Sequence, residues 1–275
     1  MPSWLKEGRG SLCGANVSLL LREMGITKPL LVAGERTKNV FFARTGMRLP
    51  VFDAFHPNPD LQDCVAGAAL YQEKGCDGLI SIGGGSAMDT AKGIKALLMT
   101  DIAHVRANQL PSEGNVPHLA IPGTAGTGAE TTAVAVLYEN GQKLSVDHPA
   151  LLPDGVLLDG SLLDTLPEYH RKSCAMDALA QGIESWWAKK ATPGSRIHAE
   201  RAIRGVLDNL TAYLQGDRKA QDEMLHAAYE SGVAILTTRT TAAHAMSYQI
   251  TKKLGAAHGH ACMLTLPHLW AHLAA

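Results

Sequence analysis

Two histidines near the end of the chain have a spacing that suits a metal site. His244 and His258 stand fourteen residues apart, the first in a helical segment and the second at the loop or helix start beyond it. Asp177 is the best candidate for a third ligand. Three such ligands would leave a divalent cation with an open position, where a substrate oxygen can be polarised. The alternative is that each histidine is an ordinary core residue on an apolar helix face.

A glycine-rich segment is the second feature of chemical interest. Gly83, Gly84, Gly85 and Ser86 join a buried strand to a helix that carries Asp89. Glycines let the backbone approach a ligand closely, and the N–H groups at a helix start attract phosphate. The segment matches neither the GxGxxG motif nor the P-loop motif. A tight turn that holds no ligand is therefore the alternative.

A second loop of small residues strengthens the phosphate interpretation. Thr124 and Thr127 lie in a glycine-rich run that follows another strand. Loops at the same end of a parallel sheet define the crevice in which open α/β folds bind ligands. An earlier strand ends at Gly34, where dinucleotide folds often carry an acidic residue that holds the ribose. The missing carboxylate, with Arg36 two residues later, slightly favours NADPH over NADH.

The composition is that of a globular protein with a substantial core. Of the 275 residues, 46% are hydrophobic and 19% are charged, and 25 Lys and Arg balance 26 Asp and Glu. A net charge of −1 gives no field that would attract nucleic acid or a membrane surface. We find no apolar stretch of transmembrane length and no signal peptide in the sequence. The five cysteines are unclustered, which is typical of reduced thiols in a cytoplasmic protein.

The pattern of apolar runs divides the chain into two parts. In the first part, short buried runs alternate with helical patterns, which predicts a parallel sheet with helices on both faces. Strands are expected at 29–33, 49–53, 78–82 and 118–121, and helices at 61–74 and 87–98. Beyond Pro167 helices are expected at 168–190, 197–214 and 222–236. We predict an α/β domain over residues 1–165 and an all-helical domain over residues 166–275.

Taken together, the motifs resemble the iron-containing, metal-dependent alcohol dehydrogenases. The resemblance rests on Pro57-Asn58-Pro59, Gly83–Ser86 with Asp89 and Lys92, Thr124–Gly128, Leu158-Asp159, Met176–Leu179, His244–Met246 and His258-Gly259. It implies a Rossmann-like parallel-sheet domain followed by an all-helical domain, the dehydroquinate synthase-like superfold, with the active site in the cleft between them. It also implies NAD or NADP and a divalent metal, Fe²⁺ or Zn²⁺, as cofactors.

The resemblance assigns roles to individual residues. The positions that it implies along the cofactor are Asn58, Gly83, Gly84, Gly85, Ser86, Asp89, Thr124, Thr127 and Lys143, to which the strand pattern described above adds Gly34. The metal ligands that it implies are Asp177, His244 and His258. Iron-binding members usually have a further histidine four residues after the aspartate, where this chain has Gln181. Two alternatives follow: three protein ligands with water, or Gln181 as a weak fourth ligand. Tyr248 stands where many members have a histidine of the proton path and is the candidate catalytic proton donor, with His260 as the alternative.

A narrower likeness is to the phosphonoacetaldehyde-reductase branch of the family, in the stretches around Gln181 and Tyr248. The expected function is reversible hydride transfer between NAD(P)H and a small aldehyde or alcohol, in an enzyme that could be a homo-oligomer. Two alternatives stay open: a lyase of the dehydroquinate-synthase type, and an inactive truncated remnant. The chain stops where family members continue through more of the helical domain, which indicates a fragment or a shortened protein.

Overall fold

The structure is a computed structural model that describes residues 6–112, 114 and 116–274. It contains two compact units. The first comprises the chain up to Gly123 together with Thr132–Asp159, and the second comprises Thr124–Thr131 and the chain from Gly160 onward. The first is an α/β unit and the second is helical, so the predicted fold class is confirmed.

A parallel sheet of six strands forms the centre of the α/β unit. The strands are β1 (Lys6–Arg9), β2 (Pro29–Ala33), β3 (Val51–Phe52), β4 (Gly78–Gly83), β5 (His118–Pro122) and β8 (Gly155–Leu158). Their order across the sheet is β1-β8-β5-β4-β2-β3, and every neighbouring pair is parallel. All residues of β2, β4, β5 and β8 are buried. Strands buried on both faces read as continuous apolar runs, which explains why the sequence revealed β2, β4 and β5.

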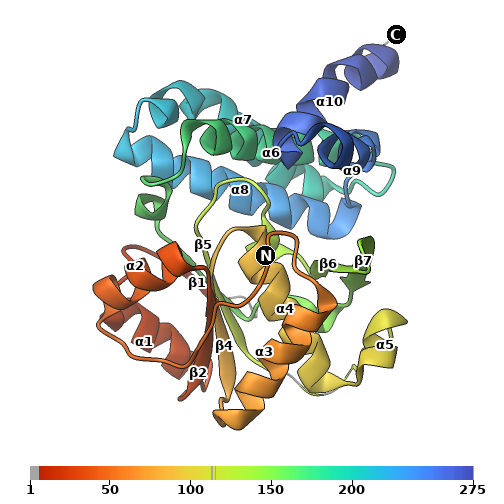
Figure 1. The fold of residues 1–275 in the computed structure, drawn as a ribbon. Coiled ribbons are helices and arrows are strands. Elements are labelled where there is room, and N and C mark those ends of the chain that lie inside the picture. The colour runs from red at the N-terminus through yellow and green to blue at the C-terminus, as the bar shows by residue number, and fades with distance from the viewer. Residues whose placement is uncertain (1–5, 113, 115, 275) are drawn as a thin grey trace. The chain divides into compact units, whose positions relative to one another are not determined.

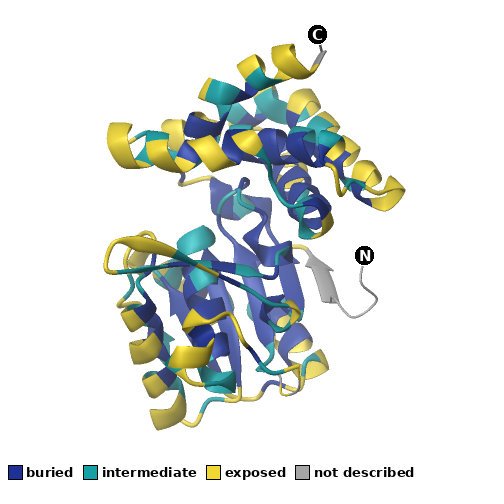
Figure 2. Ribbon diagram, turned by 90° about the vertical axis from the view of Figure 1, so that its right-hand side faces the viewer, coloured by how far each residue is buried: buried dark blue, intermediate teal, exposed yellow. Residues whose placement is uncertain are grey.

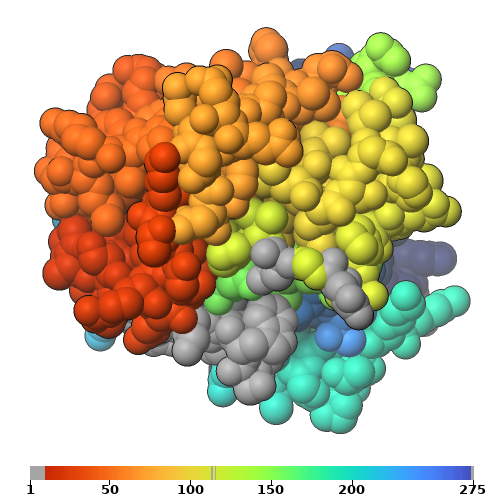
Figure 3. Space-filling model, turned by 90° about the horizontal axis from the view of Figure 1, so that it is seen from below, coloured from red at the N-terminus to blue at the C-terminus, as the bar shows by residue number. Residues whose placement is uncertain are grey.

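Helices cover both faces of this sheet. They are α1 (Gly14–Glu23), α2 (Glu35–Thr45), α3 (Leu61–Glu73) and α4 (Gly85–Met99), followed by the short α5 (Ile102–Arg106). Figure 1 shows α1 and α2 on one face and α3 and α4 on the other. Leu61, Cys64 and Ile94 from α3 and α4 join the strand residues in one apolar core. Seen from below in Figure 3, the N-terminal residues, coloured red to yellow, form a continuous surface over this unit.

An antiparallel hairpin that the sequence analysis did not predict follows β5. It consists of β6 (Val134–Glu139) and β7 (Gln142–Asp147). The two residues of its turn, Asn140 and Gly141, both have positive φ, at 50° and 73°. An Asn-Gly pair is a strong hairpin signal because both residues tolerate this conformation. The signal was therefore present in the sequence.

Five long helices build the second unit. They are α6 (Glu168–Trp187), α7 (Pro193–Leu214), α8 (Arg218–Thr238), α9 (Ala242–Leu254) and α10 (His258–Ala274). Short 3₁₀ helices span Ala129–Thr131 and Gly160–Leu163 in this unit, and a third, Pro149–Leu151, lies in the α/β unit. The central α6 packs against α7, α8 and α10, and α10 packs against α9. Figure 2 shows buried residues along the inner faces of these helices and exposed residues along their outer faces. Among the described residues, none of the helices is long and apolar enough to cross a membrane.

Candidate metal centre and glycine-lined pocket

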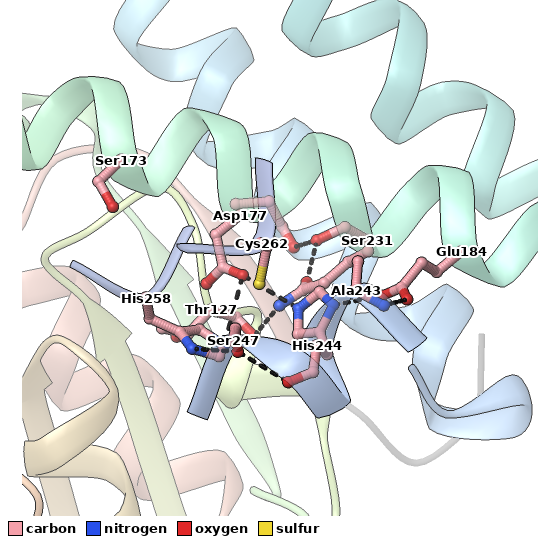
Figure 4. A network of polar contacts seen from close by, with 12 residues as sticks. Thr127, Ser173, Asp177, Glu184, Ser231, Ala243, His244, Ser247, His258 and Cys262 are labelled. Carbon is pink, nitrogen blue, oxygen red and sulfur yellow. Dashed lines mark hydrogen bonds and ion pairs between the residues drawn. The ribbon is translucent and has the colours of Figure 1, made fainter. Parts of the chain in front are cut away.

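Four side chains of the helical unit converge in what we call the four-donor cluster: Asp177, His244, His258 and Cys262. One ligand atom from each lies within 4.8 Å of those of the other three. Figure 4 shows the four side chains pointing toward one another. Asp177 lies in the middle of α6 and His244 near the start of α9, while His258 begins α10 and Cys262 follows one turn later. Three of them are buried, whereas the His258 side chain is 36% exposed and leaves the cluster open on one side.

One carboxylate oxygen faces both imidazoles. Nε2 of His244 lies 3.2 Å from Oδ1 of Asp177, and Nε2 of His258 lies 3.8 Å from the same oxygen. The two imidazole rings are 5.3 Å apart between centroids. Carboxylate oxygen and imidazole nitrogen are ordinary ligands of Zn²⁺ and Fe²⁺. The three residues expected to bind metal are therefore brought together, with donor atoms that could share one cation.

Hydrogen bonds hold each imidazole by its other nitrogen. Glu184 on α6 accepts from Nδ1 of His244, and it also accepts from the Thr241 hydroxyl and the Ala243 N–H. The hydroxyl of Ser247 donates to the His244 carbonyl oxygen and accepts from Nδ1 of His258, at 3.2 Å. With Nδ1 of each ring held in this way, Nε2 is the ring atom that faces Asp177. Glu184 and Ser247 were not among the predicted site residues, because only the fold brings them to the histidines.

The charges of the cluster are strongly coupled. Burial alone would raise the pKa of Asp177, yet the charge of His258 and the hydrogen bond and charge of His244 hold this pKa below its ordinary value. Burial alone would lower the pKa of His244, yet hydrogen bonds with Asp177, Cys262 and Glu184 raise it well above its ordinary value. A cation that takes an imidazole nitrogen as its ligand must displace any proton that this nitrogen carries.

A glycine next to His258 lets α10 approach α6. A Cβ atom at Gly259 would lie 2.0 Å from the carbonyl oxygen of Ser173 and 2.7 Å from the backbone nitrogen of Asp177. The next N–H along α10, that of His260, donates to the Ser173 hydroxyl at 3.1 Å. Because a side chain at residue 259 would force the helices apart, Gly259 is what places His258 close to Asp177.

Gln181 holds a loop. Its side-chain nitrogen donates to the carbonyl oxygen of Thr127 at 3.1 Å, and its side-chain oxygen accepts from the hydroxyl of Ser231 at 2.7 Å. Thr124 and Thr127 thus belong to a loop fastened to α6 within the helical unit. The amide nitrogen thus holds the loop and the amide oxygen bonds α8, one helical turn from Asp177.

Tyr248 lies beside the cluster. It stands one turn after His244 on α9, and its ring stacks on that of His258 with centroids 5.7 Å apart. The residue is 37% exposed, on the same open side as His258. Its position therefore fits a group that exchanges protons with solvent.

A pocket of about 330 Å³ lies in the α/β unit, at the carboxyl ends of β2 and β4. Its lining consists of Gly34, Glu35, Arg36, Thr37, Phe55 and Ile82–Ala87. The connection from β2 leads outward to β3, whereas the connection from β4 leads to β5 on the other side. Such a point of divergence is where open α/β sheets bind their ligands. The pocket brings together Gly34, Gly83, Gly84, Gly85 and Ser86 of the expected cofactor residues.

Two helix starts face this glycine-lined pocket. Gly34 precedes α2 and Gly84 precedes α4, and both are lining residues. A glycine has no side chain with which to cap the first N–H groups of a helix. These groups and the positive ends of the two helix dipoles are therefore available to an anion such as a phosphate.

The remaining expected cofactor residues lie around α4. The N–H of Asn58, a residue with φ of 58°, donates to the Ser86 hydroxyl at 3.3 Å. Removal from water raises the pKa of Asp89 to about 7, although the charges of Lys92 and Lys143 and a hydrogen bond from the Val136 N–H oppose this rise. Lys143 on β7 thus lies near Asp89, but neither of these two residues lines the pocket.

Comparisons with known proteins identify the family. Residues 2–160 match the model of the iron-containing alcohol dehydrogenases, and residues 172–275 match the model of the C-terminal domain of the same family. The probable alcohol dehydrogenase EutG of Escherichia coli is 34% identical over 250 residues, which cover 88% of this chain and 60% of that protein. Phosphonoacetaldehyde reductase of Streptomyces viridochromogenes is 36% identical over 228 residues, covering 78% of this chain and 58% of that protein.

A solved structure extends the likeness to the fold. Sulfoacetaldehyde reductase from Bifidobacterium kashiwanohense, in complex with NAD⁺, superposes with a TM-score of 0.88 at 29% identity. The superposition covers 98% of this chain and 74% of that one. The chain spans only about 60% of the length of the two curated relatives named above. Because both family models match and together cover nearly the whole sequence, the chain belongs to the iron-containing alcohol dehydrogenase family.

Proposed function

We propose that this chain catalyses reversible hydride transfer between NAD(P)H and a small aldehyde, with a divalent metal at the four-donor cluster. The observation that carries the proposal is the convergence of Asp177, His244 and His258 around one carboxylate oxygen. A divalent cation bound there would act as a Lewis acid on a carbonyl oxygen. The partial exposure of His258 leaves a side from which a substrate can arrive.

The protein's own residues prepare this site. Glu184 and Ser247 fix the two imidazoles, so that little reorganisation is needed when a cation binds. Tyr248, stacked on His258 at the exposed side, is our candidate for the proton donor to the alkoxide oxygen. A phenol hydroxyl carries a proton that it can donate to an alkoxide oxygen.

The glycine-lined pocket is the proposed site of the nucleotide. Its two helix starts would bind the pyrophosphate through backbone N–H groups, and Asn58 would fix the Ser86 hydroxyl beside them. Gly34 leaves room for a 2′-phosphate, and the exposed Arg36 lines the same pocket. These two residues favour NADPH over NADH.

The proposed substrate is a two-carbon aldehyde that carries an anionic group, with phosphonoacetaldehyde as the first candidate. One relative is named a phosphonoacetaldehyde reductase, and the NAD⁺-bound neighbour is named a sulfoacetaldehyde reductase. Both named substrates join an aldehyde to a tetrahedral anion. The motifs around Gln181 and Tyr248 support the same branch of the family.

The test is an assay of NADH and NADPH oxidation with acetaldehyde, phosphonoacetaldehyde and sulfoacetaldehyde, with and without added Fe²⁺ or Zn²⁺. We expect one cofactor to be oxidised per aldehyde reduced, which a lyase that regenerates its NAD would not do. Asp177→Ala and His258→Ala should abolish turnover. Asp208→Ala and His268→Ala, at exposed positions of α7 and α10, are matched controls that should keep it. A folded protein that binds neither metal nor NAD(P)H would instead be an inactive remnant.

A further inference from the structure

The fourth donor of the cluster is a thiol. Cys262 stands one helical turn after His258, and residues four apart on a helix share a face, so both side chains point at Asp177 and His244. Its sulfur belongs to the set of ligand atoms within 4.8 Å of one another, and it is hydrogen-bonded to His244. We propose that Cys262 is a fourth protein ligand of the metal, in place of the histidine that iron-binding members carry at the position of Gln181. This proposal rests on the metal site of the proposed function.

Both polar atoms of the Gln181 side chain have hydrogen-bond partners outside the four-donor cluster. Its side-chain nitrogen is committed to the Thr127 carbonyl oxygen and its side-chain oxygen to the Ser231 hydroxyl. Turning the amide toward Asp177 would release the loop that contains Thr127 and leave the buried Ser231 hydroxyl without this partner. In the proposed site the fourth donor therefore comes from α10, the helix that also supplies His258, and not from Gln181 of α6.

The ordinary alternative is that Cys262 is a small core residue. It does contact Ala180, Ala243 and Leu266, which form an apolar cluster with it. The other fully buried cysteine, Cys64, shows what such a residue looks like, because it lies among aliphatic and aromatic side chains in the core of the α/β unit. Cys262 differs because one of its sides faces three metal-ligand side chains rather than further apolar groups.

The thiol has a chemical consequence for the choice of metal. On binding, the thiol would lose its proton to solvent and the thiolate sulfur would bond the cation. Together with the Asp177 carboxylate, the thiolate would balance the two positive charges of the ion. Thiolate is a soft ligand that favours Zn²⁺ over harder cations, whereas a set of imidazole and carboxylate alone discriminates less. We therefore expect this site to retain zinc in competition with Fe²⁺.

Cobalt substitution tests the ligand directly. The whole chain is stripped of metal with a chelator and titrated with Co²⁺, whose thiolate complexes absorb strongly in the near ultraviolet. We expect this absorption in the unaltered protein and in Cys64→Ala, the matched removal of a buried thiol, and its loss in Cys262→Ala. The affinity of Cys262→Ala for Zn²⁺ should fall by at least about tenfold, because even groups outside the ligand set contribute that much.

The outcomes separate this proposal from the function on which it rests. If bound Co²⁺ shows only the visible absorption bands that nitrogen and oxygen ligands produce, Cys262 is not a ligand. The proposed metal site itself would stand in that case. A protein that binds no Co²⁺ would overturn both. If Cys262→Ala does not fold, X-ray absorption of the zinc-loaded unaltered protein decides, since one sulfur at about 2.3 Å is expected from Cys262. A zinc shell without sulfur would refute the proposal.

Discussion

Glu184 accepts a hydrogen bond from Nδ1 of His244, which leaves Nε2 of that ring facing Asp177 at 3.2 Å. The same carboxylate accepts from the Thr241 hydroxyl and the Ala243 N–H, so it also fixes the first turn of α9. Two of the three proposed metal-binding elements are thereby joined through one side chain of α6. Because Asp177 and Glu184 lie two turns apart on α6, this helix positions both a proposed metal ligand and the carboxylate that orients His244.

Removal of the Glu184 carboxylate should weaken metal binding, although Glu184 is not itself a proposed metal ligand. In Glu184→Ala the His244 ring is free to turn, and we expect the affinity for Zn²⁺ to fall about 10- to 100-fold. Glu184→Gln keeps an acceptor oxygen and should lose less. Competition with a chromophoric chelator measures both values. Glu200→Ala, which removes an exposed carboxylate of α7, is the control, and equal effects in the two alanine variants would contradict the positioning role.

The close contact of α10 with α6 predicts a steric effect at Gly259. In Gly259→Ala the new methyl group would lie 2.0 Å from the Ser173 carbonyl oxygen, so one helix must move. We expect unfolding free energy to fall by about 1–3 kcal/mol, the usual cost of overpacking. Metal affinity should fall as well, because His258 moves with α10. Gly194→Ala is the matched control, since the nearest atom there is the Thr192 hydroxyl at 3.8 Å, and thermal unfolding compares the two variants.

The open space at Gly34 predicts that cofactor preference can be reversed. Its φ is −70°, and no atom of the described residues would lie within 4 Å of a Cβ added there. Gly34→Asp should therefore fold, and a carboxylate preceding α2 would also cap that helix. We expect the ratio of NADPH to NADH affinity to fall at least about tenfold, which corresponds to roughly 1.4 kcal/mol of repulsion from a 2′-phosphate. Gly34→Ala adds the Cβ without the charge and should keep the original ratio.

The raised pKa of Asp89 predicts a pH-dependent stability. Desolvation raises this pKa to about 7 in the folded protein, above the ordinary value that the unfolded chain restores. Between those values the folded state binds the extra proton, so the contribution of Asp89 to stability is lost as pH rises toward 7 and is constant beyond it. Asp89→Asn should remove this decline, which is on the order of 2 kcal/mol because two units of pH separate pH 5 from the folded-state pKa of about 7. Chemical denaturation at pH 5 and pH 8 measures it, and parallel curves for the two proteins would refute the assignment.

The sequence was most informative where a single element carries the signal. The buried runs of β2, β4 and β5 were predicted because parallel strands covered on both faces are apolar throughout. The change from strands to long helices after Pro167 was equally clear. The Asn140-Gly141 hairpin was missed although its turn signal is local. The short edge strand β3 was expected within residues 49–53, whereas the edge strand β1 gave little pattern to detect.

The motifs alone led to the family, its cofactor classes and the trio Asp177, His244 and His258, because residue types at particular spacings are properties of the chain itself. Only the tertiary structure revealed Glu184 and Ser247 behind the two imidazoles, the attachment of Gln181 to the Thr127 loop, and Cys262 in the cluster. These groups have no sequence signal of their own. Their roles arise because helices pack side by side and bring together residues that are far apart in sequence. Those contacts depend on how closely the helices approach one another. A glycine such as Gly259 permits the close approach.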